Sequence, residues 1–151
     1  MPRWLLTAPF AIALATALPV RAEKVDLSPE ELRKTATHVV VGQITAVYSR
    51  VETNGDWRYT HHIAEVRVAE TEKGDGLKKG DLTYARYWQK QWVGRGKQPP
   101  DTSGHRGLPN QGETIRIYMA RNAYDGFGTT NDGGFNVIGA NGFEPVKAAG
   151  K

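Results

Sequence analysis

Apolar and polar residues alternate with a period of two along most of this chain, which is the pattern of β-strands. Residues 38–48 are rich in β-branched side chains and are apolar on both phases at their start, as in a strand buried on two sides. Polar, glycine-containing stretches separate this segment from the later ones. Four further segments continue the alternation: 58–71, 82–88, 114–119 and 134–138.

The segment that starts at residue 38 and the segment 58–71 are predicted to form a hairpin. Asn54-Gly55 favours a type I′ turn, because that turn needs a positive φ at both central residues. In the returning strand the large side chains occupy odd positions up to Ile63, whereas the apolar face continues on even positions from Ala64. A bulge near Ile63–Glu65 would reconcile the two halves.

One short helix has clear start signals. Ser28 is a good N-cap, a proline follows it at the first helical position, and Glu31 completes a capping box. Leu27 and Leu32 are spaced to form a hydrophobic staple across the cap. The pattern predicts a helix from Pro29 to about Thr35.

Together these elements predict an all-β fold with one short N-terminal helix. Five strands of this length favour a small five-stranded antiparallel barrel of OB-like, Greek-key type, with a β-sandwich as the second choice. We expect a single β-barrel domain at residues 23–146, with a short Phe143–Val146 segment near its end. Residues 147–151 are expected to form a flexible tail.

The first 22 residues have the pattern of a secretory signal peptide. Arg3 supplies a positive start, residues 4–18 carry no charge, and Val20-Arg21-Ala22 resembles a signal cleavage site. A membrane anchor is the alternative, but the apolar run is shorter than the ~20 residues that span a bilayer, and it contains Pro9. We therefore expect a periplasmic or secreted bacterial protein with no transmembrane span after cleavage.

The net charge and the absence of cysteine exclude several classes of function. Loss of Arg3 and Arg21 with the signal lowers the net formal charge from +4 to +2, so nucleic-acid binding is not expected from the overall charge. The chain contains no cysteine. This excludes a lipid-anchored lipoprotein, disulfides, thiolate zinc sites and cysteine nucleophiles.

Several segments occur in an order typical of a known class of exported proteins. They are Ala36–Ile44, Ala64–Val68, Lys73-Gly74 and Gly80-Asp81. This order resembles uncharacterised exported bacterial proteins whose pattern is similar to the OB-type barrel of the tissue-inhibitor-of-metalloproteinase and netrin-module superfamily. The resemblance implies an OB-like barrel. It does not extend to protease inhibition, because the inhibitors of that superfamily act through an N-terminal cysteine.

The segment from Tyr87 to Gly112 interleaves aromatic and basic side chains, and Asp101 is its only acid. Aromatic rings stack on sugars or bases, and arginine and lysine pair with sulfate, phosphate or carboxylate groups. We therefore predict a non-catalytic binding or structural domain that engages a polysaccharide, another polyanion or an envelope protein. The alternative is that the tryptophans fill the core. The candidate ligand-binding residues are Tyr87, Trp88, Trp92, Arg95, Lys97, His105 and Arg106.

No catalytic or metal-binding motif is specific enough to name a reaction, and we predict neither a metal nor a cofactor. His61 and His62 are neighbours on a predicted strand, so they point to opposite faces and cannot chelate one ion together. The alternative function is a small secreted hydrolase that uses His105 or His61 with a carboxylate.

Overall fold

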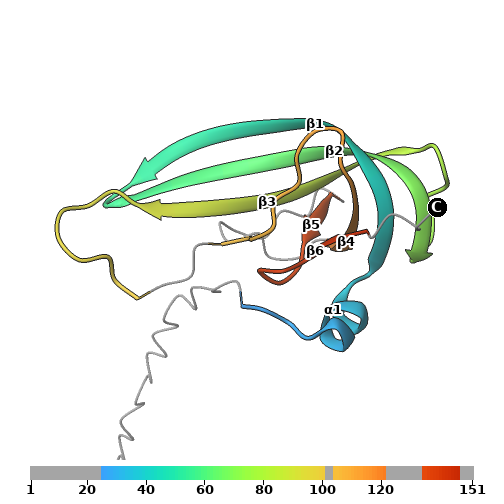
Figure 1. The fold of residues 1–151 in the computed structure, drawn as a ribbon, viewed down its shortest axis with the longest axis horizontal. Coiled ribbons are helices and arrows are strands. Elements are labelled where there is room, and N and C mark those ends of the chain that lie inside the picture. Colours follow the sequence, from blue (N-terminus) through green and yellow to red (C-terminus); the bar gives the residue numbers. More distant parts are fainter. Residues whose placement is uncertain (1–24, 101–103, 122–133, 147–151) are drawn as a thin grey trace, which may run out of the picture.

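The computed structural model describes residues 25–100, 104–121 and 134–146, which form one short helix and six strands (Figure 1). The predicted signal peptide and the predicted C-terminal tail lie outside these residues. Within the described ranges, no helix has both the length and the hydropathy that a membrane span requires. The elements are α1 (Pro29–Thr35), β1 (His38–Asn54), β2 (Trp57–Lys73), β3 (Leu82–Trp92), β4 (Thr114–Arg121), β5 (Phe135–Val137) and β6 (Phe143–Pro145).

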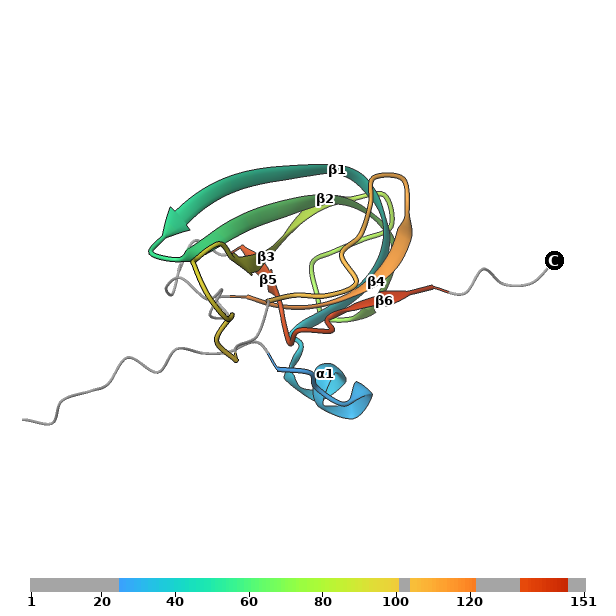
Figure 2. The same cartoon turned by 60° about the vertical axis from the view of Figure 1, so that its left-hand side comes forward.

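The six strands form one mixed sheet that curls into a partial ring (Figure 2). Their order is β1-β2-β3-β5-β4-β6, and β1 also pairs with β4. The all-β prediction is confirmed. The expectation of a wholly antiparallel sheet is corrected, because Ala85 and Arg86 of β3 pair in parallel with Phe135 and Asn136 of β5. Periodicity reports which residues share a face but carries no information on strand direction.

Helix α1 begins and ends where the sequence predicts. The Ser28 side chain accepts a hydrogen bond from the Glu31 backbone amide at 3.2 Å, and the Glu31 carboxylate accepts one from the Ser28 amide at 2.8 Å. These reciprocal bonds satisfy two amides that a helix start leaves unpaired. Leu27 packs in the same apolar cluster as Leu32, as expected for the staple.

The β1–β2 ladder has three register irregularities, and the one nearest to the predicted position has its extra residue in β1, whereas the prediction placed it in β2. Ile44 pairs with Val66 and Ala46 pairs with Glu65, so Thr45 is the extra residue. Its hydroxyl donates to the Glu65 carboxylate at 2.6 Å. The small polar side chain thus fixes the bulge to the opposite strand.

Strand β2 keeps one phase from Trp57 to Arg67, which corrects the predicted slip near Ile63. From Trp57 to Arg67 it pairs with β3 without interruption. Its even-numbered residues Ala64 and Val66 are buried in the core. The large odd-numbered residues therefore all lie on the opposite face, and the sequence pattern that suggested a phase change marks an aromatic-rich outer surface.

The turn between β1 and β2 lies at residues 55–56, one position later than the predicted Asn54-Gly55 centre. Asn54 pairs with Trp57 as the last residues of the two strands. Gly55 has a φ of 59°, so the residue that tolerates a positive φ is the first of the turn.

The core divides into two apolar clusters. The larger one fills the inside of the curled sheet, and Ile115, Ile117 and Met119 of β4 all point into it, as their alternation predicts. The smaller one lies between α1 and the outside of the ring, where Tyr118 packs with Leu32. The larger cluster comprises Val40, Ile44, Ala64, Val66, Ala85, Tyr87, Ile115, Ile117, Met119, Phe135, Val137 and Phe143.

Candidate functional site

A cavity of about 340 Å³ lies on the hairpin half of the sheet. Three consecutive cross-strand rows of β1, β2 and β3 line it. Cross-strand neighbours share a face, so the first and third rows place six side chains on one side of the sheet and the middle row faces the other side. The rows are Tyr48–Ile63–Arg86, Ser49–His62–Tyr87 and Arg50–His61–Trp88.

The six side chains of the first and third rows combine aromatic surface with positive charge. Tyr48 is 56% exposed, whereas Trp88 is only 5% exposed and forms the buried wall. Arg50 and Arg86 add guanidinium groups that carry a positive charge at all physiological pH values. Such a combination suits a ligand that presents both an apolar ring face and anionic groups.

The same face, here called the outer face, continues from the cavity to the hairpin turn. Trp57 and Trp92 are paired across β2 and β3, and their rings meet edge to face with centroids 5.2 Å apart. The Lys90 ammonium group lies 4.6 Å from the centre of the Trp57 ring. The indole N–H of Trp92 is buried and has no hydrogen-bond partner among the described residues. The outer face thus carries a strip of aromatic and cationic groups about 20 Å long, from the row of Tyr48 to the Trp57–Trp92 pair.

The middle row forms a polar and aromatic stack on the opposite face. The Ser49 hydroxyl and His62 Nδ1 are 2.7 Å apart, and the His62 ring stacks on Tyr87 with centroids separated by 4.8 Å. Burial lowers the pKa of His62 below its ordinary value and raises the pKa of Tyr87 to about 12. Both groups are therefore neutral near pH 7.

One histidine of the cavity also contacts a carboxylate. His61 Nε2 lies 3.6 Å from Glu52 Oε1, at the edge of the cavity. The hydrolase alternative requires a carboxylate near His61, but this separation is longer than a hydrogen bond.

The structure separates the predicted ligand-binding residues. Trp88 and Trp92 lie on the side of β3 opposite to Tyr87, which points into the core cluster. Trp88 is buried, as the alternative to ligand binding predicts, whereas Trp92 is partly exposed. Arg95 and Lys97 are exposed in the segment that follows β3. The remaining two, His105 and Arg106, do not line the cavity.

His105 is buried and ties two strands together. Its Nδ1 lies 3.2 Å from the Trp88 amide nitrogen, and its Nε2 lies 3.0 Å from the Val137 carbonyl oxygen. Nδ1 also lies 3.1 Å from the Trp88 carbonyl oxygen, so the ring contacts the backbone of both Trp88 and Val137. The preceding Gly104 has a φ of 90°, and a Cβ there would meet the Trp88 carbonyl oxygen at 2.5 Å. His105 is only 1% exposed, so it is a structural link between β3 and β5.

Arg106 forms an ion pair with Asp26 on the surface. Both side chains are more than half exposed. This contact holds the segment before α1 against the segment before β4, and neither residue lines the cavity.

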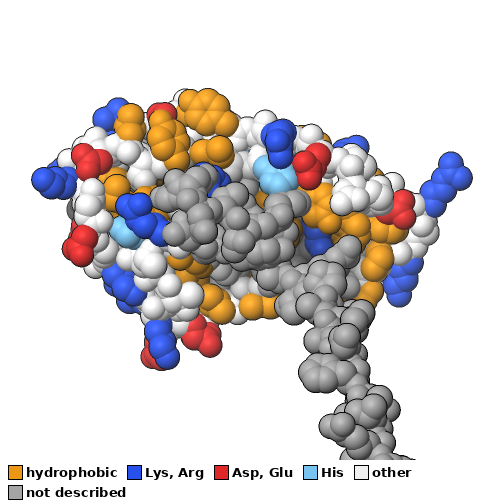
Figure 3. All heavy atoms as spheres, turned by 180° about the vertical axis from the view of Figure 1, so that it is seen from behind, with side chains coloured by type: hydrophobic (Ala, Val, Ile, Leu, Met, Phe, Trp, Pro, Cys, Tyr) orange, Lys and Arg blue, Asp and Glu red, His pale blue; other side chains and the backbone are white. Residues whose placement is uncertain are grey.

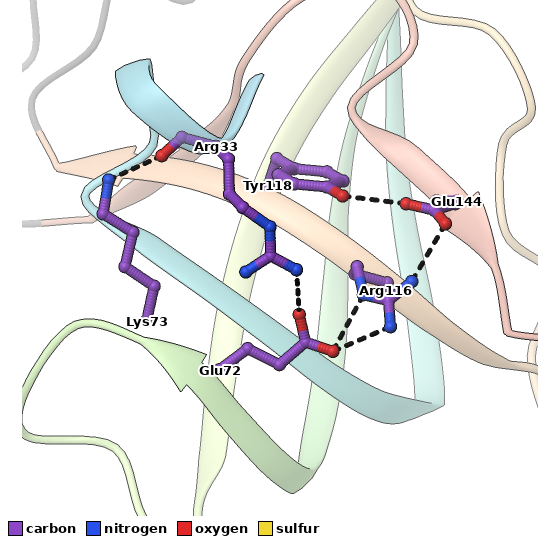
Figure 4. Close-up of polar contacts among 6 residues, drawn as sticks. All are labelled: Arg33, Glu72, Lys73, Arg116, Tyr118 and Glu144. Carbon is purple, nitrogen blue, oxygen red and sulfur yellow. Dashed lines mark hydrogen bonds and ion pairs between the residues drawn. The ribbon is translucent and has the colours of Figure 1, made fainter. Parts of the chain in front are cut away.

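A second polar cluster lies near α1, at the other end of the sheet (Figure 4). Glu72 of β2 accepts from Arg33 of α1 at 2.8 Å and from Arg116 of β4 at 2.7 Å. The hydrogen bonds from Arg116 are the main cause that lowers the pKa of Glu72. Arg116 and Tyr118 also hold Glu144 of β6, at 2.9 Å and 2.8 Å. Because these charges pair with one another across four elements, this charged network serves to join them.

No group of three or more histidine or acidic side chains in the described residues could hold a metal ion. Tyr48 and Arg50, which line the cavity, were not predicted from the sequence. Large side chains occupy every second position in each of the three strands. That these positions form common rows becomes clear only when the register between the strands is known.

Comparisons with protein-family models, with curated proteins and with solved structures give no match for this chain.

Proposed function

We propose that this protein is an exported, non-catalytic domain that binds an acidic carbohydrate along the outer face of β1, β2 and β3. The observation that carries the proposal is the cavity of about 340 Å³, in which Tyr48 and Trp88 lie beside Arg50 and Arg86. The exposed Tyr48 ring can stack on the apolar face of a sugar, with Trp88 as the wall beneath, and guanidinium groups bind the carboxylate or sulfate substituents of a sugar.

The extent of the outer face supports an extended ligand. Beyond the cavity, Lys90 and the Trp57–Trp92 pair repeat the same combination of ring and cation. A ligand with several sugar units can contact both places at once, which raises the affinity without new kinds of contact.

The strand topology supports ligand binding on the outer face of β1, β2 and β3. We propose that the partial ring is an OB-like barrel, since β1, β2, β3, β5 and β4 pair in a cycle that returns to β1. OB-type barrels bind oligosaccharides and oligonucleotides on the face of their second and third strands. The predicted signal peptide at 1–22 would deliver the domain to a compartment that contains such polysaccharides.

Calorimetric titration of the mature protein with a sulfated oligosaccharide tests the proposal. We expect binding that weakens as salt rises, because exposed charges are screened beyond ~8 Å at physiological ionic strength. Tyr48→Ala and Arg50→Gln should each weaken binding by about 1–2 kcal/mol.

Two matched variants serve as controls. Tyr84→Ala removes an exposed tyrosine of the same face that lies outside the cavity and bonds to Glu65. Arg58→Gln removes an exposed arginine of the same hairpin that lines a different depression. Both should leave the affinity unchanged. Equal losses in all four variants, or equal binding of an uncharged oligosaccharide, would contradict the proposal.

The hydrolase alternative has one specific contact in its favour, between His61 and Glu52 at 3.6 Å. A general base of this kind needs a carboxylate that orients the imidazole. Release of nitrophenol from chromogenic esters by the wild type, abolished in His61→Gln, would favour this second function over binding alone.

A further inference from the structure

Half of strand β1 has an edge with no partner strand among the described residues. Strand β4 pairs with β1 only from His38 to Gln43, and two backbone hydrogen bonds at Ile44 end this contact. From Thr45 to Asn54, β1 pairs with β2 alone. Figures 1 and 2 both place this stretch at the outer margin of the sheet.

This edge has few of the features that keep natural sheet edges apart. Exposed edges are usually protected by proline, by charged side chains, above all lysine, by bulges or by very short strands. The one bulge of this stretch lies at its start, at Thr45. Residues 45–54 contain neither proline nor lysine. Val51 is 58% exposed and Tyr48 is 56% exposed, and Figure 3 shows hydrophobic side chains at the upper margin of the molecule, where Figure 1 places β1. The edge is long, apolar in part and open to pairing.

The charges of the edge are self-complementary. In an antiparallel pair of two identical strands centred on Val51, Arg50 faces Glu52 of the second copy, and Glu52 faces its Arg50. In a hairpin with a two-residue turn, the pair that flanks the turn is hydrogen-bonded, and here that pair is Asn54 and Trp57. The backbone groups of successive residues then point alternately toward and away from the partner strand. Glu52 therefore bonds to β2, whereas the amide and carbonyl of Val51 point away from it. Val51 is thus in the correct phase to form the central hydrogen-bonded pair.

We propose that the β1 edge from Thr45 to Asn54 is a homodimer interface, with a second copy of this chain as the occupant. Two such edges form one continuous sheet across a twofold axis. Because Arg50 and Glu52 lie on the face that carries the cavity, the two cavities lie on the same side of the joined sheet. The dimer then presents two ligand sites in one direction.

Sedimentation equilibrium of the mature protein, from about 1 µM to about 500 µM, tests this interface in the absence of any ligand. We expect a monomer–dimer equilibrium. Glu52→Arg places arginines opposite arginines, and Arg50→Glu places glutamates opposite glutamates, so each should raise the dissociation constant about tenfold. The double variant Arg50→Glu/Glu52→Arg restores opposite charges and should restore the dimer.

Thermal unfolding of the three variants is the control for an effect on the fold. The pair of charges is exposed within one copy, with 3.4 Å between Arg50 Nη2 and Glu52 Oε2, so thermal unfolding of the monomer should change little in all three variants. A wild type that stays monomeric over the whole range overturns the proposal. A dimer that persists equally in both single variants overturns the assignment to the β1 edge.

Discussion

At the scale of single residues, His105 is held by backbone groups of two strands that are far apart in the sequence. It contacts the Trp88 amide on β3 and the Val137 carbonyl on β5. A buried ring with both nitrogens engaged has no lone pair to offer a substrate. The histidine that suggested a hydrolase or a ligand contact in the sequence therefore connects β3 to the short strand that lies beside it.

His105→Ala should lower the free energy of unfolding by roughly 2–4 kcal/mol, because it removes buried contacts to the backbone of two strands and opens a cavity. Urea unfolding followed by tryptophan fluorescence measures the change. The matched control is Arg106→Ala, which removes an exposed ion pair with Asp26 and should cost less than about 1 kcal/mol. Equal losses in the two variants would show that the bonds of His105 do not support the fold.

At the scale of elements, the charged network joins α1 and β6 to the sheet. Glu72 connects the helix to β4 through Arg33 and Arg116, and Glu144 connects β6 to the same arginine (Figure 4). The side chain of Glu72 is only 14% exposed, so its ion pairs are screened less than surface pairs are. A seven-residue helix is not stable without such contacts and the apolar cluster beneath it.

Glu72→Gln should lower the free energy of unfolding by about 1–2 kcal/mol at pH 7. The arginines lower the pKa of Glu72 in the folded state, so the unfolded state binds its proton first as the pH falls. This stabilisation is present above the unfolded pKa of ~4.3 and is lost as the pH falls through the folded pKa. Below about pH 4.5, the free energy of unfolding should therefore fall less steeply with pH in the variant than in the wild type.

Glu70→Gln is the control for this experiment, because it removes an exposed acid from the same strand. We expect it to change stability by no more than about 0.5 kcal/mol. If Glu72→Gln behaves like Glu70→Gln at pH 7, the network does not join the elements as the geometry indicates.

At the scale of the whole molecule, the local signals in the sequence were sufficient for the helix and for the β-rich class. The Ser28 cap and the alternation along 114–119 depend on residues close in sequence, and both predictions are confirmed. The parallel pairing of β3 with β5 depends on contacts between distant segments. No local pattern contains that information.

The same distinction applies to the candidate site. Trp88 and Trp92 could be predicted because aromatic and basic residues alternate near them in the sequence. Tyr48 and Arg50 could not, since they come from β1 and join Trp88 only through the register of three strands. The bulge at Thr45 sets that register, and its place in β1 depends on a tertiary contact with Glu65.

The central claim is that an acidic carbohydrate binds in the cavity between Tyr48 and Trp88, and amide chemical-shift mapping tests it most directly. The mature protein, labelled with ¹⁵N, is titrated with a sulfated oligosaccharide and, separately, with an uncharged one. We predict shifts that are largest in the three cross-strand rows of the cavity and extend to Trp57 and Trp92, with the sulfated ligand alone. Shifts centred on Arg116 and Glu72, or no saturable shifts with either ligand, would contradict the account.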